Sequence, residues 1–205
     1  EVQENIWFVP NCIDTYNFYE DRSVKKEKII LCPRNIRWER GIHLAIEVFH
    51  KFHKFSKYKE YKLVILGGPL KGRYYNSCLL LVKKYELQDC INFNGSVDSE
   101  TMKSYYRRSM LTIIPTIEQE GTSLSALESM ACGTPVVSTS NGGLVDLPTV
   151  KSKTESKDMS EKIKSTLENY DQIKNNQMHE THTLFNMHNW TKAWRKITEN
   201  AIRNG

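Results

Sequence analysis

The chain has 205 residues, of which 39% are hydrophobic and 26% charged, with a formal net charge of +5. This length can bury one complete α/β core, and the small charge gives no reason to expect a nucleic-acid partner. No apolar run approaches the roughly 20 residues of a membrane span, and no charged-then-apolar leader opens the chain. We therefore expect a soluble, cytoplasmic protein.

Short apolar runs alternate with amphipathic patterns along the chain. The runs are typical of buried parallel strands, and the amphipathic patterns are typical of helices. Because such alternation indicates βαβ units, we predict an α/β fold with a Rossmann-like parallel sheet and helices on both faces. The expected strands are 29–32, 63–66, 91–93, 111–114 and 136–138, and the expected helices are 42–55, 76–85, 100–107 and 123–131.

Basic residues follow the first expected strand. Arg34 comes after Pro33 at the carboxyl end of that strand, and Arg40 precedes Gly41, which opens the next helix. Both would reach an anion at this edge of the sheet. Taken alone, three arginines within seven positions also fit a solvated turn, and Arg37 remains a competitor to Arg40.

The segment after 111–114 combines a loop with the start of a helix. Pro115 and Gly121 mark the loop, Ser123 is the expected N-cap, and 133–135 (GTP) ends the helix. Such a turn points the amino end of the helix and its free N–H groups at the carboxyl edge of the sheet. It therefore predicts an anion-binding site.

Two glutamates bracket this site. Glu120 is expected at the mouth of the loop, and Glu128 lies deeper along the helix if Leu127 and Met130 face the core. Ionised carboxylates are strong acceptors for hydroxyl groups, so the pair fits a ligand with phosphate in the middle and hydroxyls at both ends. Taken alone, the two glutamates fit surface positions equally well. Glu118 is a rival to Glu120 that we expect to be solvated.

The same segment carries a family resemblance. Glu120 and Gly121 through Glu128, followed by 130–137 (MACGTPVV), resemble the E-x7-E signature of the retaining glycosyltransferases of family 4, which have the GT-B fold. Further blocks resemble that family in the same order, which is more specific than the glutamate spacing alone. They are 9–14 (VPNCID), similar to an interdomain linker, 34–41 (RNIRWERG), 63–69 (LVILGGP), 91–97 (INFNGSV) and 141–146 (NGGLVD).

The resemblance implies a donor site for a nucleotide-diphosphate sugar, without a metal ion or cofactor. Arg34 and Arg40 would stabilise the diphosphate leaving group, Glu120 would hold a hydroxyl of the transferred sugar, and Glu128 would hold the ribose hydroxyls. Gly142 and Gly143 would approach a phosphate, although the pair fits a simple turn equally well. The remaining predicted donor-binding residues are Gly95, Val97, Gly121, Thr122, Ser123 and Leu124.

The resemblance also implies a domain organisation. Residues 1–205 would form one nucleotide-sugar-binding domain, with 1–14 as the end of an interdomain linker and 157–205 as carboxyl-terminal helices. An N-terminal acceptor domain would be absent, and the isolated domain is expected to be inactive. The whole enzyme would transfer a hexose to a glycan or lipid-linked acceptor in polysaccharide assembly. The stretch 147–150 is too brief for the glycine-bearing loop and short strand that are usual there, so that loop is shortened or residues are absent.

Two alternative functions remain open at this stage. A GT-B sugar-nucleotide epimerase would bind a similar donor but would lack the E-x7-E block. A non-catalytic nucleotide-sugar-binding module would keep the fold, and Cys12, where the family prefers a glycine able to adopt positive φ, favours that module.

Three other features do not indicate a site. The odd number of cysteines shows no ligand spacing, so we expect reduced, mostly buried thiols. The histidines at 179, 182 and 188 do not share a helix face, so no metal is predicted. Aromatic residues interleave with lysines over 49–62, where we expect Phe49 and Phe52 in the core, with peripheral membrane contact as an alternative. The cysteines are Cys12, Cys32, Cys78, Cys90 and Cys132.

Overall fold

Strand β1 (Glu27–Cys32) lies near the centre of a six-stranded sheet with the order β3-β2-β1-β4-β5-β6. The computed structural model describes residues 7–204, and every strand pair in the sheet is parallel. The predicted Rossmann-like parallel sheet is confirmed, and each expected strand is present. The other strands are β2 (Lys62–Ile65), β3 (Ile91–Phe93), β4 (Ser109–Ile114), β5 (Val136–Thr139) and β6 (Val150–Ser152).

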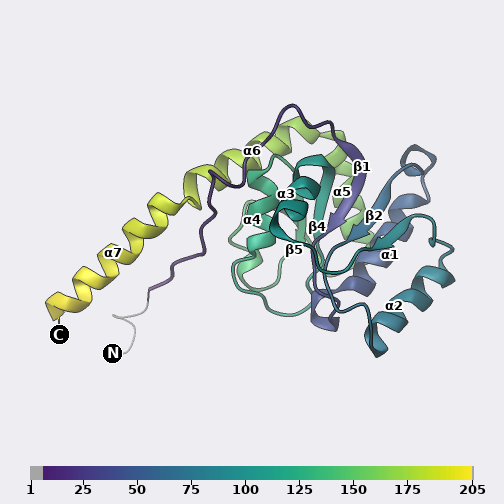
Figure 1. Ribbon diagram of the computed structural model, residues 1–205, viewed down its shortest axis with the longest axis horizontal. Helices are drawn as coiled ribbons and strands as arrows, with labels where there is room; N and C mark the ends of the chain where they lie inside the picture. Colours follow the sequence, from purple (N-terminus) through teal and green to yellow (C-terminus); the bar gives the residue numbers. More distant parts are fainter. Residues whose placement is uncertain (1–6, 205) are drawn as a thin grey trace.

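Helices cover both faces of this sheet, as predicted (Figure 1). Helices α1, α2 and α5 pack on one face, α3 and α4 pack on the other, and α6 packs behind α4. All the helices expected from the sequence are present. The bounds are α1 (Ile42–His53), α2 (Arg73–Lys84), α3 (Ser99–Arg108), α4 (Leu124–Ala131), α5 (Ser156–Glu168), α6 (Tyr170–Leu184) and α7 (Met187–Asn204), with short 3₁₀ turns η2 (Trp38–Arg40), η3 (Ser56–Tyr58) and η4 (Gly142–Leu144).

The apolar core lies on both faces of the sheet. Phe49 and Phe52 of α1 are fully buried, which confirms their interpretation as core residues. On the opposite face, Leu127 and Met130 of α4 pack in a cluster with Ile114 of β4. Burying side chains of this size stabilises the fold by roughly 1.5–3 kcal/mol each, and it fixes α4 so that Glu128 points away from that cluster.

The order of the strands reverses between β1 and β4. From β1 the chain adds β2 and β3 on one side, whereas from β4 it adds β5 and β6 on the other. The loops that leave the carboxyl ends of β1 and β4 therefore diverge and open a crevice between them. In open α/β sheets this crevice is the usual place for a ligand.

The polar stretch after Asp146 corrects one expectation. Its residues hold a short strand after all, because β6 pairs with β5 from Val150 onward. Lys151 closes the loop before this strand by donating hydrogen bonds to the carbonyl oxygens of Leu144 and Leu147. An edge strand needs little apolar surface, so composition alone did not reveal it.

The N-terminal segment of the described chain packs against the junction of α6 and α7. The N–H of Ile13 donates a hydrogen bond of 2.7 Å to the carbonyl of Phe185, and α7 projects from the body of the domain (Figure 1). Residues 1–6 of the predicted linker lie outside the described residues. Among residues 7–204 only Glu86 combines a non-glycine side chain with positive φ, so Cys12 is unstrained and no longer favours the binding-module alternative.

Candidate active site

A hollow of about 340 Å³ opens at the carboxyl edge of the sheet, over the crevice between β1 and β4. Its walls come from the loops after β1, β2 and β3, together with α3 and the first turn of α4. The site thus gathers residues that are far apart in the sequence. The lining residues are Pro33, Arg34, Asn35, Arg40, Leu66, Gly67, Ser96, Val97, Met102 and Ser125.

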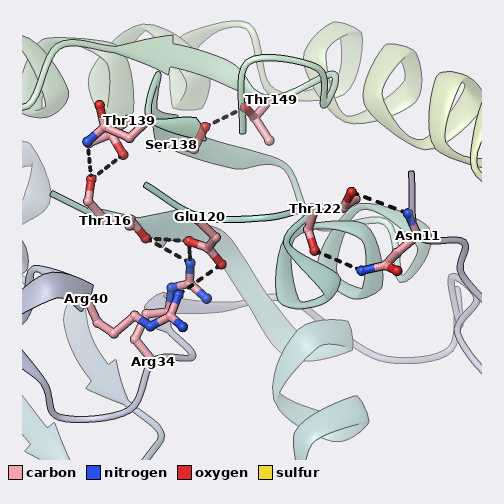
Figure 2. A network of polar contacts seen from close by, with 10 residues as sticks. Asn11, Arg34, Arg40, Thr116, Glu120, Thr122, Ser138, Thr139 and Thr149 are labelled. Carbon is pink, nitrogen blue, oxygen red and sulfur yellow. Dashed lines mark hydrogen bonds and ion pairs between the residues drawn. The ribbon is translucent and has the colours of Figure 1, made fainter. Parts of the chain in front are cut away.

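Glu120 lies beside this hollow, and the guanidinium groups of two arginines converge on its carboxylate (Figure 2). Nη2 of Arg34 pairs with the carboxylate, and Nη1 of Arg40 lies 3.3 Å from Oε1. The side chains of Arg34 and Glu120 are only 7% and 9% exposed. Buried charges of this kind are stable only when they are paired, so the three side chains form one unit, here called the Arg34–Glu120–Arg40 cluster.

Thr116 holds the cluster together. Its hydroxyl accepts a hydrogen bond of 2.8 Å from Arg34 and donates one of 2.6 Å to Glu120. The backbone carbonyl of Thr116 in turn accepts hydrogen bonds from Thr139 and Asn141 (Figure 2). The end of β5 and the following loop therefore fix the position of the cluster.

The two glutamates differ in their electrostatics. Burial raises the pKa of Glu120, but Arg34, Thr116 and Arg40 together outweigh it, so that pKa lies below its usual value. Burial also raises the pKa of Glu128, and a hydrogen bond of 2.9 Å from the Tyr106 hydroxyl offsets it only in part. Glu120 is thus held as an anion, whereas Glu128 is biased toward its neutral form.

Gly142 and Gly143 lie against the backbone of the loop that carries Glu120. A Cβ at Gly142 would come within 2.3 Å of the Glu120 carbonyl oxygen, and one at Gly143 within 2.8 Å of the Gly121 carbonyl carbon. The N–H of Gly143 also donates a hydrogen bond of 2.6 Å to that Glu120 carbonyl. These glycines therefore permit a close backbone approach that positions Glu120.

The amino end of α4 follows this loop. Ser123 occupies the N-cap position as predicted, and Thr122 contacts Asn11 of the linker segment (Figure 2). The Ser123 hydroxyl and Nε of Arg34 are buried without a hydrogen-bond partner among residues 7–204. Because Arg34 lines the hollow, its unpartnered Nε leaves capacity for an acceptor-rich ligand.

The structure separates the predicted site residues from their rivals. Arg40 joins the cluster, whereas Arg37 is 67% exposed and lies 3.9 Å from Glu39. Glu118 is exposed, as expected. Val97 lines the hollow, and the carbonyl of Gly95 accepts a hydrogen bond from Gly67 beside it. Leu124 points largely to solvent, with 46% of its surface exposed.

Sequence reasoning missed two partners of the glutamates. Thr116 lies two residues after the end of the predicted strand and four residues before Glu120, which was the available signal. Tyr106 carried no such signal, because it reaches Glu128 from a different helix. Within residues 7–204 no group of His, Cys, Asp or Glu side chains is arranged to hold a metal ion, and no helix is long and apolar enough to cross a membrane.

Together, a doubly wound parallel sheet and a charged cluster at its switch point define a domain of the GT-B glycosyltransferase type. A model of the glycosyl transferases group 1 family matches residues 17–183. The chain therefore belongs to this family, in agreement with the resemblance seen in the sequence.

Similar proteins agree with this assignment. An uncharacterised glycosyltransferase of Methanocaldococcus jannaschii, MJ1607, is 32% identical over 122 residues, which is 59% of this chain and 29% of that protein. The C-terminal domain of a group 1 glycosyltransferase from Francisella tularensis superposes with a TM-score of 0.74 at 22% identity, over 85% of this chain and 99% of that domain. HepE from Anabaena, solved with UDP-glucose, superposes with a TM-score of 0.80 at 16% identity, over 95% of this chain and 57% of that protein.

Proposed function

We propose that the chain is the donor-binding domain of a retaining glycosyltransferase that transfers a sugar from a nucleotide-diphosphate sugar. The observation that carries the proposal is the Arg34–Glu120–Arg40 cluster beside the hollow at the switch point of the sheet. Its guanidinium groups, including the unpartnered Nε of Arg34, suit a diphosphate, and its carboxylate suits a sugar hydroxyl.

The two arginines would act on the leaving group. Breaking the bond between the anomeric carbon and the diphosphate builds negative charge on the diphosphate oxygens. Arg34 and Arg40, with the N–H groups at the start of α4, would stabilise this charge without a metal ion, and each preorganised donor is worth on the order of 3 kcal/mol. Glu120 neutralises one of the two guanidinium charges, so the donor diphosphate would compete with this carboxylate for the arginines.

The two carboxylates would bind the ends of the donor. Glu120 would accept a hydrogen bond from a hydroxyl of the transferred sugar and fix its orientation. Glu128 would hold the ribose hydroxyls by accepting hydrogen bonds from them. Neither residue needs to act as a nucleophile in this mechanism.

The acceptor would be a glycan or a lipid-linked saccharide, bound by an N-terminal domain. HepE and this chain share a fold over only 57% of HepE, which supports a second domain in the whole enzyme. We place the reaction in the cytoplasm, where sugar nucleotides are made. Exposed lysines around the half-exposed Phe55 offer a surface for anionic lipids, and sedimentation with anionic and neutral vesicles tests it. These lysines are Lys51, Lys54, Lys57 and Lys59.

Thermal unfolding with UDP, GDP and ADP tests the donor site directly. A ligand at about a hundred times its dissociation constant adds roughly 2.7 kcal/mol, which raises the midpoint of a domain of this size by about 5–10 °C. We expect one nucleotide to give this shift, with UDP first in line because HepE was solved with UDP-glucose. Glu128→Ala should abolish the shift, and Glu118→Ala, a change at an exposed glutamate, should preserve it.

The alternatives give different outcomes. If none of the three nucleotides shifts the midpoint of the folded chain, the donor-site proposal is wrong for this domain. If the nucleotide binds but the full-length protein neither transfers nor hydrolyses the donor sugar, the chain is a non-catalytic nucleotide-sugar-binding module. Epimerisation of the donor without transfer would identify a sugar-nucleotide epimerase.

A further inference from the structure

Tyr106 of α3 is the largest fully buried side chain among residues 7–204, with 0% of its surface exposed. It belongs to one apolar cluster with Leu66, and Val97 and Met102 pack against that cluster. Leu66, Val97 and Met102 also line the hollow at the switch point of the sheet. Tyr106 therefore lies behind the wall of the proposed donor site, where it does not itself contact a ligand.

The ring of Tyr106 is held in a fixed position. Phe18 meets it edge to face, with 6.5 Å between the ring centroids and an interplanar angle of 61°. The backbone carbonyl of Tyr106 accepts a hydrogen bond from the buried hydroxyl of Thr134. Because buried hydroxyls are almost always hydrogen-bonded, the fixed ring determines where the partner of the Tyr106 hydroxyl must lie.

That partner is Glu128 on the neighbouring helix α4 (Figure 1). The Tyr106 hydroxyl donates a hydrogen bond of 2.9 Å to Oε2 of Glu128. The other carboxyl oxygen, Oε1, has no hydrogen-bond partner among residues 7–204, and Glu128 stays partly accessible to solvent. Ser125, three positions earlier on the same helix face, lines the hollow. The bond at Oε2 thus fixes the rotation of the carboxyl group and leaves Oε1 available to a ligand.

We propose that Tyr106 is a positioning residue that aims the free oxygen of Glu128 at the ribose, so that the domain prefers ribonucleotides to 2′-deoxyribonucleotides. The proposal rests on the proposed function, in which Glu128 holds the ribose hydroxyls. Without the Tyr106 bond the carboxyl group would rotate among several orientations, and a ribose hydroxyl would have to order it on binding. This ordering weakens the contact and lowers the discrimination that it gives.

Calorimetric titration measures this preference. The ligands are the nucleoside diphosphate that stabilises the domain, UDP, GDP or ADP, and its 2′-deoxy form. Because a hydrogen bond to a charged acceptor typically changes affinity about tenfold, we expect the wild type to bind the ribonucleotide roughly tenfold more tightly. In Tyr106→Phe the preference should fall to about threefold or less, since the carboxyl group is no longer preorganised. A lower stability of the variant cancels from this ratio, because both ligands are measured on the same sample.

Two controls separate positioning from a general effect on packing. Pyrophosphate lacks the ribose and should bind the wild type and Tyr106→Phe equally. Tyr105→Phe, at the neighbouring residue whose hydroxyl accepts a hydrogen bond from Asn94, should keep the wild-type preference.

Three outcomes would overturn the proposal. The first is an unchanged preference in Tyr106→Phe. The second is an equal weakening of both nucleotides and pyrophosphate by that variant, which would show a merely structural role for Tyr106. The third is equal binding of the two nucleotides by the wild type, which leaves no preference to explain. If none of UDP, GDP and ADP binds the wild type, the proposed function itself fails.

Discussion

The loop that carries Glu120 and the helix that carries Glu128 shift the pKa of a glutamate side chain in opposite directions. Both carboxyl groups are largely buried, and burial raises both pKa values. Glu120 has two guanidinium groups as neighbours, whereas Glu128 has the neutral Tyr106 hydroxyl. The neighbours, and not the depth of burial, therefore decide the direction in which the pKa of each carboxyl group is shifted.

Replacing Arg34 should have the largest effect on the environment of Glu120. Arg34→Leu would leave Glu120 buried with Arg40 as its remaining cationic partner, and Arg40 is 35% exposed. Removing one member of a buried ion pair typically costs about 3 kcal/mol, so we expect a loss of this size in the free energy of unfolding. Urea denaturation at pH 7 measures it.

Arg37→Leu is the matched control for this change. Arg37 belongs to the same loop but is 67% exposed, so we expect its replacement to alter the free energy of unfolding by less than about 0.5 kcal/mol. Equal losses for the two variants would show that Glu120 does not depend on Arg34.

Glu120→Gln tests, through the affinity for UDP, whether Glu120 occupies the two arginines. The change releases both guanidinium groups from a competing carboxylate, so we expect UDP to bind roughly tenfold more tightly, or by about 1.4 kcal/mol. Transfer of the sugar by the whole enzyme should fall at the same time. Calorimetric titration with UDP measures the affinity, and weaker binding by the variant would contradict this account of the pairing.

Tyr106→Phe tests the Glu128 side of the comparison. It removes the one hydrogen-bond partner found for the Glu128 carboxyl group among residues 7–204, and we expect a cost of about 1 kcal/mol in unfolding. Tyr105→Phe, a change at the neighbouring residue of α3 whose hydroxyl contacts Asn94 at the surface, should cost less. A larger loss at Tyr105 would argue against the assigned role of Tyr106.

The smallest expected effect is a difference in how the two glutamates make the stability of the fold depend on pH. Because the pKa of Glu120 is lowered, Glu120 stabilises the fold at pH values above the ordinary glutamate pKa of about 4.3. This stabilisation is lost as the pH falls through the folded-state pKa. The raised pKa of Glu128 has the opposite effect on stability. It lowers the free energy of unfolding as the pH rises above about 4.3.

Glu120→Gln and Glu128→Gln should therefore change the pH profile of stability in opposite directions. The stability advantage of the wild type over Glu120→Gln should shrink below about pH 4.3, whereas any advantage of Glu128→Gln should grow above it. Unfolding midpoints measured from pH 3 to pH 7 give both differences. Parallel profiles would contradict the two assigned environments.

The same contrast explains what the sequence could predict. Buried parallel strands are apolar on both faces, so β1, β4 and β5 were recognisable, and the glutamate spacing marked the site. The bond between Arg34 and Thr116 joins residues 82 positions apart, which no local pattern encodes. Only the packed sheet brings the two residues together.

Helix α6 lies within the predicted carboxyl-terminal helices of 157–205, but the contact that fixes it to the sheet was not predictable. Its fully packed positions include the polar Gln177 and Thr181, so it lacks the usual apolar stripe. The Gln177 side chain accepts a hydrogen bond of 2.7 Å from the Val136 N–H and donates one of 2.9 Å to the Val136 carbonyl. A side-chain amide that pairs with a strand backbone in this way has no signature in the sequence.

The central claim is that the cluster at the switch point binds the diphosphate of a nucleotide. Calorimetric titration of UDP into the wild type, Arg40→Ala and Arg37→Ala tests it most directly, because only Arg40 joins the cluster. Loss of one charge-assisted contact should weaken binding by Arg40→Ala roughly tenfold, while Arg37→Ala binds as the wild type does. Equal affinities for all three proteins, or a loss confined to Arg37→Ala, would contradict the account.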